Sequence, residues 1–466
     1  MLLKRIALLK TAVKNKNRVE FKLKAMFKML FLAGIATTLF AETENVFAQA
    51  SYKFDFGTGK VAGGFKQVVA TTKYNDAQGY GFDYNSQVTA LDRGGNDALT
   101  SDFCTSNSPF FFSVKVPEGS YKVSVTLGDL WQNSITTIKA ESRRLMIKEI
   151  KTIPGKFTTV SFMVNIRDSL LPNGQKVILK PREINQLDWD NKLTLEFSNS
   201  RPCVDAIEIQ KVENATTVYL TGNSTVTDQQ LEPWACWGQM IPSFFKSDQI
   251  VIANHAVSGS TLGAFIAHKR LEKIMNVIKP GDYLFVEFAH NDQKPGAHEK
   301  PYTTYNALLK RFIDSARAHK AIPVLVTSTC RRFFDSTGHI ENTLGEYPTA
   351  MRYEAKKDGV ALIDLNAMSA ELFNVFGPEK SKQLFVQFPS GTFPGQLNPL
   401  ADNTHFNDFG AYELAKCMVN GIRNSKLAIA KYLKGDATFN PPHPDDIKKW
   451  DLPLTPMYTS IKPLGN

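Results

Sequence analysis

The chain has 466 residues, of which 43% are hydrophobic and 21% are charged, a composition typical of a globular protein long enough for two domains. Its formal net charge is +10, but nine Lys/Arg and three Glu in residues 1–50 supply +6 of that excess. No basic run with interleaved aromatic residues follows, so we expect no nucleic-acid partner.

Residues 1–50 have the pattern of a secretory signal peptide. Three closely spaced lysines precede the apolar segment 29–40, and a small-x-small motif at 48–50 follows it. The apolar segment is too short for a comfortable membrane span, although an uncleaved amino-terminal anchor is the alternative. We therefore expect export to the periplasm or the medium, a mature chain that begins near Ser51, and no stable membrane insertion of that chain.

Residues 51–212 are rich in short alternating segments and poor in helical periodicity. The expected strands cover 110–116, 121–127, 157–164, 192–197 and 204–209. A turn at 117–120 separates the first two strands, which predicts that they pair as a β-hairpin. Several short strands with turns between them predict an all-β sandwich. The region resembles the galactose-binding-like sandwiches that are often joined to carbohydrate-active enzymes.

Two pairs of residues in this sandwich leave alternatives open. Trp131 and Trp189 can bind sugar from loops, or they can belong to the core. Cys104 and Cys203 can form a disulfide in an exported protein. The other three of the five cysteines are expected to be small buried apolar residues, and no Cys-x-x-Cys pair suggests a zinc site.

Residues 216–432 alternate strands with helices, which predicts an α/β domain with a parallel sheet covered on both faces. The expected strands cover 218–221, 250–254, 283–288, 322–327 and 360–364. The expected helices cover 262–278, 305–318, 347–357 and 409–423. Residues 433–466 form a proline-rich tail, expected to be extended. It can pack over the catalytic domain, contact a partner, or be an ordered surface tail without a function.

The first strand of this domain ends in Gly222-Asn223-Ser224. A serine at the carboxyl end of a parallel strand, followed by a helix, would expose its hydroxyl near amide N–H groups, which suits a nucleophile. Taken alone, the segment can equally be a tight turn with a helix-capping serine.

Other strand ends carry suitable partners for this serine. Gly259 can bring a backbone N–H close to a ligand, and Asn291 can donate a side-chain hydrogen bond. Asp402 and His405 are three residues apart and can lie on one turn, with the imidazole toward the serine and the carboxylate behind it.

These four blocks, in this order, resemble the SGNH hydrolase superfamily, also called GDSL-type esterases. Within it, segments 220–226, 289–292 and 402–406 are most similar to the rhamnogalacturonan acetylesterases. The resemblance implies an SGNH-type three-layer α/β fold and a Ser-His-Asp esterase that needs no metal or organic cofactor. The first block departs from the usual Gly-Asp-Ser, because Asn223 stands in place of the aspartate.

The resemblance also implies a role for each residue. Ser224 is the nucleophile, His405 the general base and acid, and Asp402 the residue that orients the imidazole. The oxyanion hole consists of the backbone N–H groups of Ser224 and Gly259 and the side chain of Asn291. The implied substrate is acetylated pectic polysaccharide, namely rhamnogalacturonan.

Three alternatives stay open. The enzyme can act on another acetylated glycan such as xylan, or on lipids or thioesters. It can also be a catalytically impaired polysaccharide-binding protein, with Asn223 as the symptom. Finally, His255, His290 and His405 can form a metal site.

Overall fold

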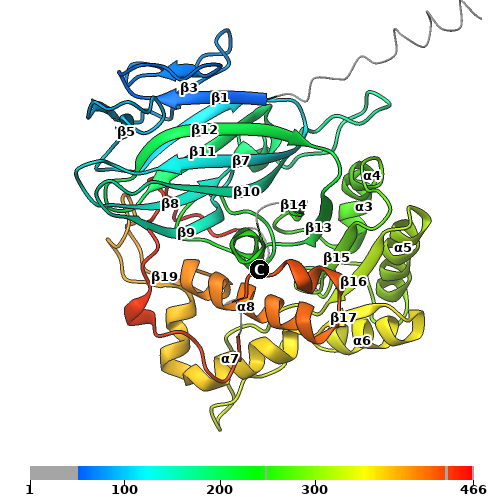
Figure 1. The fold of residues 1–466 in the computed structure, drawn as a ribbon. Coiled ribbons are helices and arrows are strands. Elements are labelled where there is room, and N and C mark those ends of the chain that lie inside the picture. Colours follow the sequence, from blue (N-terminus) through cyan, green and yellow to red (C-terminus); the bar gives the residue numbers. More distant parts are fainter. Residues whose placement is uncertain (1–50, 247–248, 436–438, 464–466) are drawn as a thin grey trace, which may run out of the picture. The chain divides into compact units, whose positions relative to one another are not determined.

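The computed structural model describes residues 51–246, 249–435 and 439–463 (Figure 1). The predicted signal peptide, residues 1–50, lies outside the described residues. Within the described part of the chain, no helix is both long and apolar enough to cross a bilayer.

A five-stranded parallel sheet forms the centre of the second half of the chain. Its strands are β13 (Thr216–Gly222), β14 (Ile250–Asn254), β15 (Tyr283–Glu287), β16 (Ile322–Val326) and β17 (Ala361–Ile363). They are ordered β14-β13-β15-β16-β17, so the chain leaves β13 toward one neighbour and later returns to its other side. The carboxyl end of β13 is therefore the point where the strand order reverses, which is where open α/β sheets place their ligands.

Alternate residues of these strands face two different hydrophobic cores. Val218 and Leu220 pack with the buried residues of α2, α7 and α8, whereas Tyr219 packs with those of α3 to α6. The helices are α2 (Trp237–Met240), α3 (Leu262–Ala267), α4 (Arg270–Met275), α5 (Thr304–Ala318), α6 (Tyr347–Asp358), α7 (Leu365–Lys380) and α8 (Asp408–Asn424). This is the predicted sheet with both faces covered.

Two local differences from the prediction appear in this domain. The single helix expected over 262–278 is two helices, because Lys269 between them has a left-handed backbone with φ of 62°. A two-stranded antiparallel sheet of β18 (Phe385–Phe388) and β19 (Leu400–Phe406) was not expected.

Residues 51–212 form two facing antiparallel sheets, with one parallel pair at an edge. The strands are β1 (Ser51–Phe56), β2 (Lys66–Val68), β3 (Tyr80–Asp83), β4 (Thr89–Asp92), β5 (Asp102–Thr105), β6 (Phe110–Lys115), β7 (Gly119–Leu127), β8 (Ser134–Ala140), β9 (Arg144–Thr152), β10 (Thr158–Ile166), β11 (Lys192–Ser198) and β12 (Cys203–Val212). One sheet runs β10-β7-β12-β1-β2 with β5 and β4 beside β12, and the other runs β3-β6-β11-β8-β9. The predicted all-β sandwich, followed by a three-layer α/β domain, is confirmed.

The predicted hairpin of β6 and β7 is wrong. β6 pairs with β3 and β11 in one sheet, whereas β7 pairs with β10 and β12 in the other. The turn at 117–119 thus carries the chain across the core. Alternating apolar residues mark a strand with one buried face, but they do not show which neighbour lies beside it.

The disulfide considered between Cys104 and Cys203 is not formed, and all five cysteines are free and buried. β5 and β12 are neighbours in which Cys203 lies opposite Thr105 and Cys104 lies opposite Val204. Because successive side chains in a strand alternate between faces, the two sulfurs point to opposite sides of the sheet.

Candidate active site

A tight turn follows β13 and holds the candidate nucleophile. The carbonyl of Asn223 accepts hydrogen bonds from the backbone N–H groups of Val226 and Thr227, and its Oδ1 accepts the N–H of Thr225 at 3.2 Å. A Cβ atom on Gly222 would lie 2.9 Å from the carbonyl oxygen of Glu287, so the neighbouring strand leaves no room for a side chain there. Asn223 thus makes the turn-forming bond of an Asx turn without carrying a charge.

The structure brings Ser224, His405 and Asp402 together. His405 Nε2 lies 2.8 Å from Ser224 Oγ, and His405 Nδ1 lies 2.7 Å from Asp402 Oδ2. The other carboxylate oxygen of Asp402 accepts the backbone N–H groups of Thr404 and His405 at 2.8 and 3.1 Å. These bonds fix the carboxylate, which in turn leaves Nε2 of the imidazole to receive the serine proton.

Two details of this cluster differ from the expectation. Asp402 and His405 lie on the strand β19 and not on a helical turn, and no helix directly follows Ser224. Ser224 is 0% exposed, His405 1% and Asp402 2%, so the expected exposed hydroxyl is wrong for this structure. Neighbouring groups enclose the turn. One of them is the Cys236 thiol, which donates a hydrogen bond to the carbonyl oxygen of Ser224 at 2.7 Å.

Burial and charge set the protonation of the pair. Burial lowers the pKa of His405, and the positive charges of Lys462 and Arg182 act in the same direction, although the bond to Asp402 opposes them. Burial alone would raise the pKa of Asp402, but the hydrogen bond and charge of His405 hold it below its usual range. At neutral pH the imidazole is therefore uncharged and the carboxylate ionised, the states that a general base and its partner require.

The oxyanion-hole candidates lie on the neighbouring loops. Gly259 has φ of 74°, a left-handed conformation that glycine adopts without strain. Among the described residues, neither the backbone N–H of Ser224 nor that of Gly259 donates a hydrogen bond. The Asn291 amide nitrogen donates to the carbonyl of Ser260 at 3.2 Å, which orients the side chain and leaves its second hydrogen available.

A cavity of about 840 Å³ adjoins these donors. Gly259 and Asn291 form one end of it, and Lys294, Glu299 and Leu308 are among the residues that line the rest. Its size suits part of a chain-like substrate placed next to the oxyanion hole.

The histidines considered for a metal site do not form one. In the described ranges, no group of three or more His, Cys, Asp or Glu residues is arranged to hold a metal ion. His255 lies against the rings of Trp189 and Tyr219, and His290 lies 3.5 Å from the Thr329 hydroxyl. Burial lowers the pKa of both imidazoles well below the usual value, so both are neutral, buried side chains.

Glu287 is a buried carboxyl group beneath the nucleophile turn that sequence reasoning missed. Its two oxygens accept the Thr225 hydroxyl at 2.8 Å and the Trp237 indole N–H at 2.7 Å. Burial raises its pKa to about 7, above the ordinary value of 4.5. The glutamate stands at the end of β15, a position the sequence does indicate, but nothing in the sequence shows that it faces Thr225.

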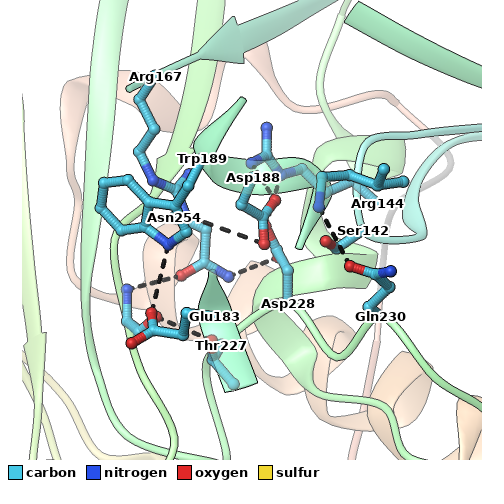
Figure 2. Close-up of polar contacts among 12 residues, drawn as sticks. Ser142, Arg144, Arg167, Glu183, Asp188, Trp189, Thr227, Asp228, Gln230 and Asn254 are labelled. Carbon is cyan, nitrogen blue, oxygen red and sulfur yellow. Dashed lines mark hydrogen bonds and ion pairs between the residues drawn. The ribbon is translucent and has the colours of Figure 1, made fainter. Parts of the chain in front are cut away.

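The sandwich contributes buried arginines to the hydrolase loops, which sequence reasoning also missed. Arg144 contacts Asp228 at 2.6 Å and Asp188 at 2.9 Å, and Asn254 donates to Asp228 at 2.7 Å (Figure 2). The guanidinium of Arg167 lies over the ring of Trp189, 4.5 Å from its centroid. Trp189 is thereby part of this junction and is not a free sugar-stacking platform.

Arg143 joins the two halves of the candidate site. Its guanidinium lies 2.5 Å from Glu232, in the loop after Ser224, and 2.7 Å from Asp408, three residues after His405. It also donates to the carbonyl oxygen of Trp234 at 2.6 Å, and the indole of Trp234 packs edge-on against the His405 ring. A residue of the sandwich thus holds the loop after Ser224 and the start of α8, which follows His405, in one position.

The carboxyl-terminal tail also reaches the site. Its backbone runs beside Glu232, whose N–H donates to the Met457 carbonyl at 2.7 Å and whose carbonyl accepts the N–H of Thr459 at 2.9 Å. Further along, Lys462 Nζ lies 3.4 Å from Asp402 Oδ2. The tail is therefore packed against the catalytic domain in the described residues.

Comparison with known proteins agrees with this geometry. The model of the GDSL-like lipase/acylhydrolase family matches residues 220–411, and a beta-agarase/YXIM esterase-like, galactose-binding domain-like model matches residues 52–172. The rhamnogalacturonan acetylesterase RhgT of Bacillus subtilis (strain 168) is 44% identical over 218 residues, which cover 46% of this chain and 93% of that protein. The probable rhamnogalacturonan acetylesterase YesY of the same organism is 35% identical over 221 residues, 47% of this chain and 97% of that protein.

A third relative has both regions. The uncharacterized esterase YxiM of Bacillus subtilis (strain 168) is 26% identical over 411 residues, 86% of this chain and 97% of that protein. The protein therefore belongs to the GDSL-like lipase/acylhydrolase family, within the SGNH superfamily of carboxylic ester hydrolases, and its hydrolase fold follows a galactose-binding-like sandwich.

Proposed function

We propose that this protein is an exported serine esterase that removes acetyl groups from pectic polysaccharide, with rhamnogalacturonan as the substrate. The observation that carries the proposal is the hydrogen-bonded series of Ser224, His405 and Asp402, together with the backbone N–H groups of Ser224 and Gly259, for which no described residue is an acceptor. The names of two relatives, both rhamnogalacturonan acetylesterases, support the choice of substrate.

In the first half-reaction, Ser224 Oγ attacks the carbonyl carbon of the acetyl ester while its proton passes to His405 Nε2. The negative charge that develops on the carbonyl oxygen is bound by the N–H groups of Ser224 and Gly259 and by Asn291. One such donor contributes about 3–4 kcal/mol to stabilising the transition state. The bond to the sugar oxygen then breaks, and that oxygen takes the proton from His405.

In the second half-reaction, water attacks the acetyl-enzyme and gives a proton to His405. The bond between Ser224 Oγ and the acetyl carbon breaks, the serine recovers its proton from the imidazole, and acetate leaves. Asp402 keeps the imidazole in one tautomer and stabilises it when it is positively charged. Because Ser224 has no exposed surface, the side chains that enclose it must move apart when the ester enters.

The proposal extends to the organisation of the chain. Residues 1–50 act as the export signal, 51–212 form the sandwich, 216–432 form the catalytic domain, and 433–466 form the tail. Asn223 is compatible with activity, because its Oδ1 supplies the same turn-forming acceptor that an aspartate would.

The test is acetate release from acetylated rhamnogalacturonan oligosaccharides by the full chain and by Ser224→Ala. We expect the variant to lose at least about 10⁴-fold in kcat, because the nucleophile and its proton path are removed together. Equal acetate release by the two proteins would refute the serine mechanism. Faster release from acetylated xylan than from the pectic oligosaccharide would refute the substrate.

A further inference from the structure

A second, smaller cavity is lined by Trp234 and Lys462, which contact His405 and Asp402 of the candidate site. Its volume is about 170 Å³, comparable to a single sugar ring. Three parts of the chain that are far apart in sequence form its walls. Arg182 and Gln186 come from the end of the sandwich, Trp234 from the loop after the nucleophile, and Lys462 from the tail.

The lining of this cavity is made of donors and cations. None of its described lining residues is acidic. The Arg182 guanidinium forms no ion pair with any described residue, and the indole N–H of Trp234, a residue 2% exposed, has no acceptor there. Lys462 is 44% exposed and faces Asp402 at 3.4 Å, so its charge also borders the cavity. A site with unused donors and excess positive charge fits an anion.

The chain segments that carry the two cations are held by contacts of neighbouring residues. Glu183, next to Arg182, pairs with Arg270 at 2.6 Å. The tail is held near Lys462 by Thr455, whose N–H donates to Glu232 at 3.0 Å and whose hydroxyl donates to Glu196 at 2.6 Å. Chain segments held in this way lose little conformational freedom when the cavity binds a ligand.

The cavity is also close enough to the reaction to hold a neighbouring part of the same substrate. Trp234 contacts the His405 ring at 5.8 Å between centroids, and Gln229, another lining residue, donates to the carbonyl of Ser224 at 3.3 Å. An ester carbonyl at Ser224 would place the rest of its polysaccharide against this wall.

From these contacts we infer that the cavity is a subsite for a uronate, a sugar that carries a carboxylate, beside the acetylated position. Arg182 and Lys462 bind the carboxylate, and Trp234 donates to an oxygen of the same ring. This inference rests on the proposed function for its substrate. On this inference, the enzyme selects a polysaccharide with a charged main chain through Arg182 of the sandwich and Lys462 of the tail. Both residues lie outside the four sequence blocks.

The experiment compares one acetylated rhamnogalacturonan oligosaccharide in two forms, with free carboxylates and with those carboxylates methyl-esterified. We expect the wild-type enzyme to favour the free-acid form by about tenfold or more in kcat/KM, the effect of one charge-assisted hydrogen bond. Arg182→Gln and Lys462→Gln should each reduce this preference severalfold, chiefly through KM for the free-acid form. Added salt should reduce the wild-type preference as well.

Arg311→Gln serves as the matched control, because Arg311 is an exposed arginine on α5 away from the cavity lining. It should keep the wild-type preference. Equal kcat/KM of the wild type on both forms, or a preference that survives in both cavity variants, would overturn the inference.

Failure of the proposed function gives a different result. If the wild type releases no acetate from either form, the substrate proposal fails, and the subsite is then judged by calorimetry with unacetylated oligogalacturonate. Saturable binding to Ser224→Ala that is lost in the Ser224→Ala/Arg182→Gln double variant would support the subsite. Absence of saturable binding to Ser224→Ala would overturn it.

Discussion

Two buried polar clusters lie close together in this protein and differ in what they leave unpaired. At the junction with the sandwich, the Arg144 guanidinium is paired with both Asp228 and Asp188. At the candidate active site, Ser224 and Gly259 keep backbone donors that no described residue uses. Paired charges give a buried cluster a structural role, whereas unused backbone donors next to a candidate nucleophile are suited to bind charge that develops during reaction.

The largest expected effect comes from breaking the structural cluster with Arg144→Met. The change removes the ion-pair partner of buried Asp228 and leaves Asp188 with only Arg167, at 4.0 Å, as a described ion-pair partner, which costs about 3–5 kcal/mol in the free energy of unfolding. Urea unfolding of the chain beginning at Ser51 measures it. Arg311→Met, at an exposed position, should change the free energy by less than about 0.5 kcal/mol. Similar values for the two variants would mean that the junction cluster adds nothing to stability.

The second-largest expected effect is a loss of activity, and it comes from Asn291→Ala in the candidate active site. We expect kcat on an aryl acetate to fall about 10²–10³-fold, because one proposed oxyanion donor is removed, while the unfolding midpoint stays near that of the wild type. Arg144→Met is thus expected to lower stability, whereas Asn291→Ala is expected to lower kcat with stability unchanged. Loss of stability without loss of kcat per folded molecule would place Asn291 in the structural cluster instead.

The smallest expected effect comes from Asn223→Asp, which introduces the aspartate that the family usually has at this position. The Thr225 hydroxyl contacts both Asn223 Oδ1, at 3.0 Å, and Glu287 Oε1, at 2.8 Å, so a carboxylate at 223 would share one hydroxyl with a second carboxyl group. Like charges in such a site raise each other's pKa.

The direction in which stability changes with pH follows from the raised pKa of Glu287. Its pKa of about 7 lies above the ordinary 4.5, so between these values the folded chain holds a proton that the unfolded chain has lost. Stability therefore falls as pH rises through this window. Asn223→Asp should steepen that fall and cost about 1–2 kcal/mol at pH 8, with little change at pH 5. The exposed Asn398→Asp is the control, and equal pH profiles for both variants would contradict this account.

The sequence predicted which segments form strands and helices better than it predicted which strands lie side by side. Strand periodicity located β13 to β17, and the first and last of the four blocks located Ser224, His405 and Asp402, which the structure joins by hydrogen bonds although β19 lies outside the parallel sheet. The sequence did not show which strands belong to the same sheet, because the expected hairpin of β6 and β7 is divided between the two sheets. Arg143 and Glu287 were missed for a related reason. Their partners are distant in sequence, and a charged residue in a strand or turn is usually solvated.

Glu232 shows what such distant contacts imply for the time course of folding. It contacts Arg143 from the sandwich and Thr455 from the tail, and the latter pair is 223 residues apart in sequence. Contacts of such long range form late, because the loops that they close must be ordered first. In a refolding experiment, esterase activity should therefore return after the two domains have regained their secondary structure, when the tail docks beside Glu232.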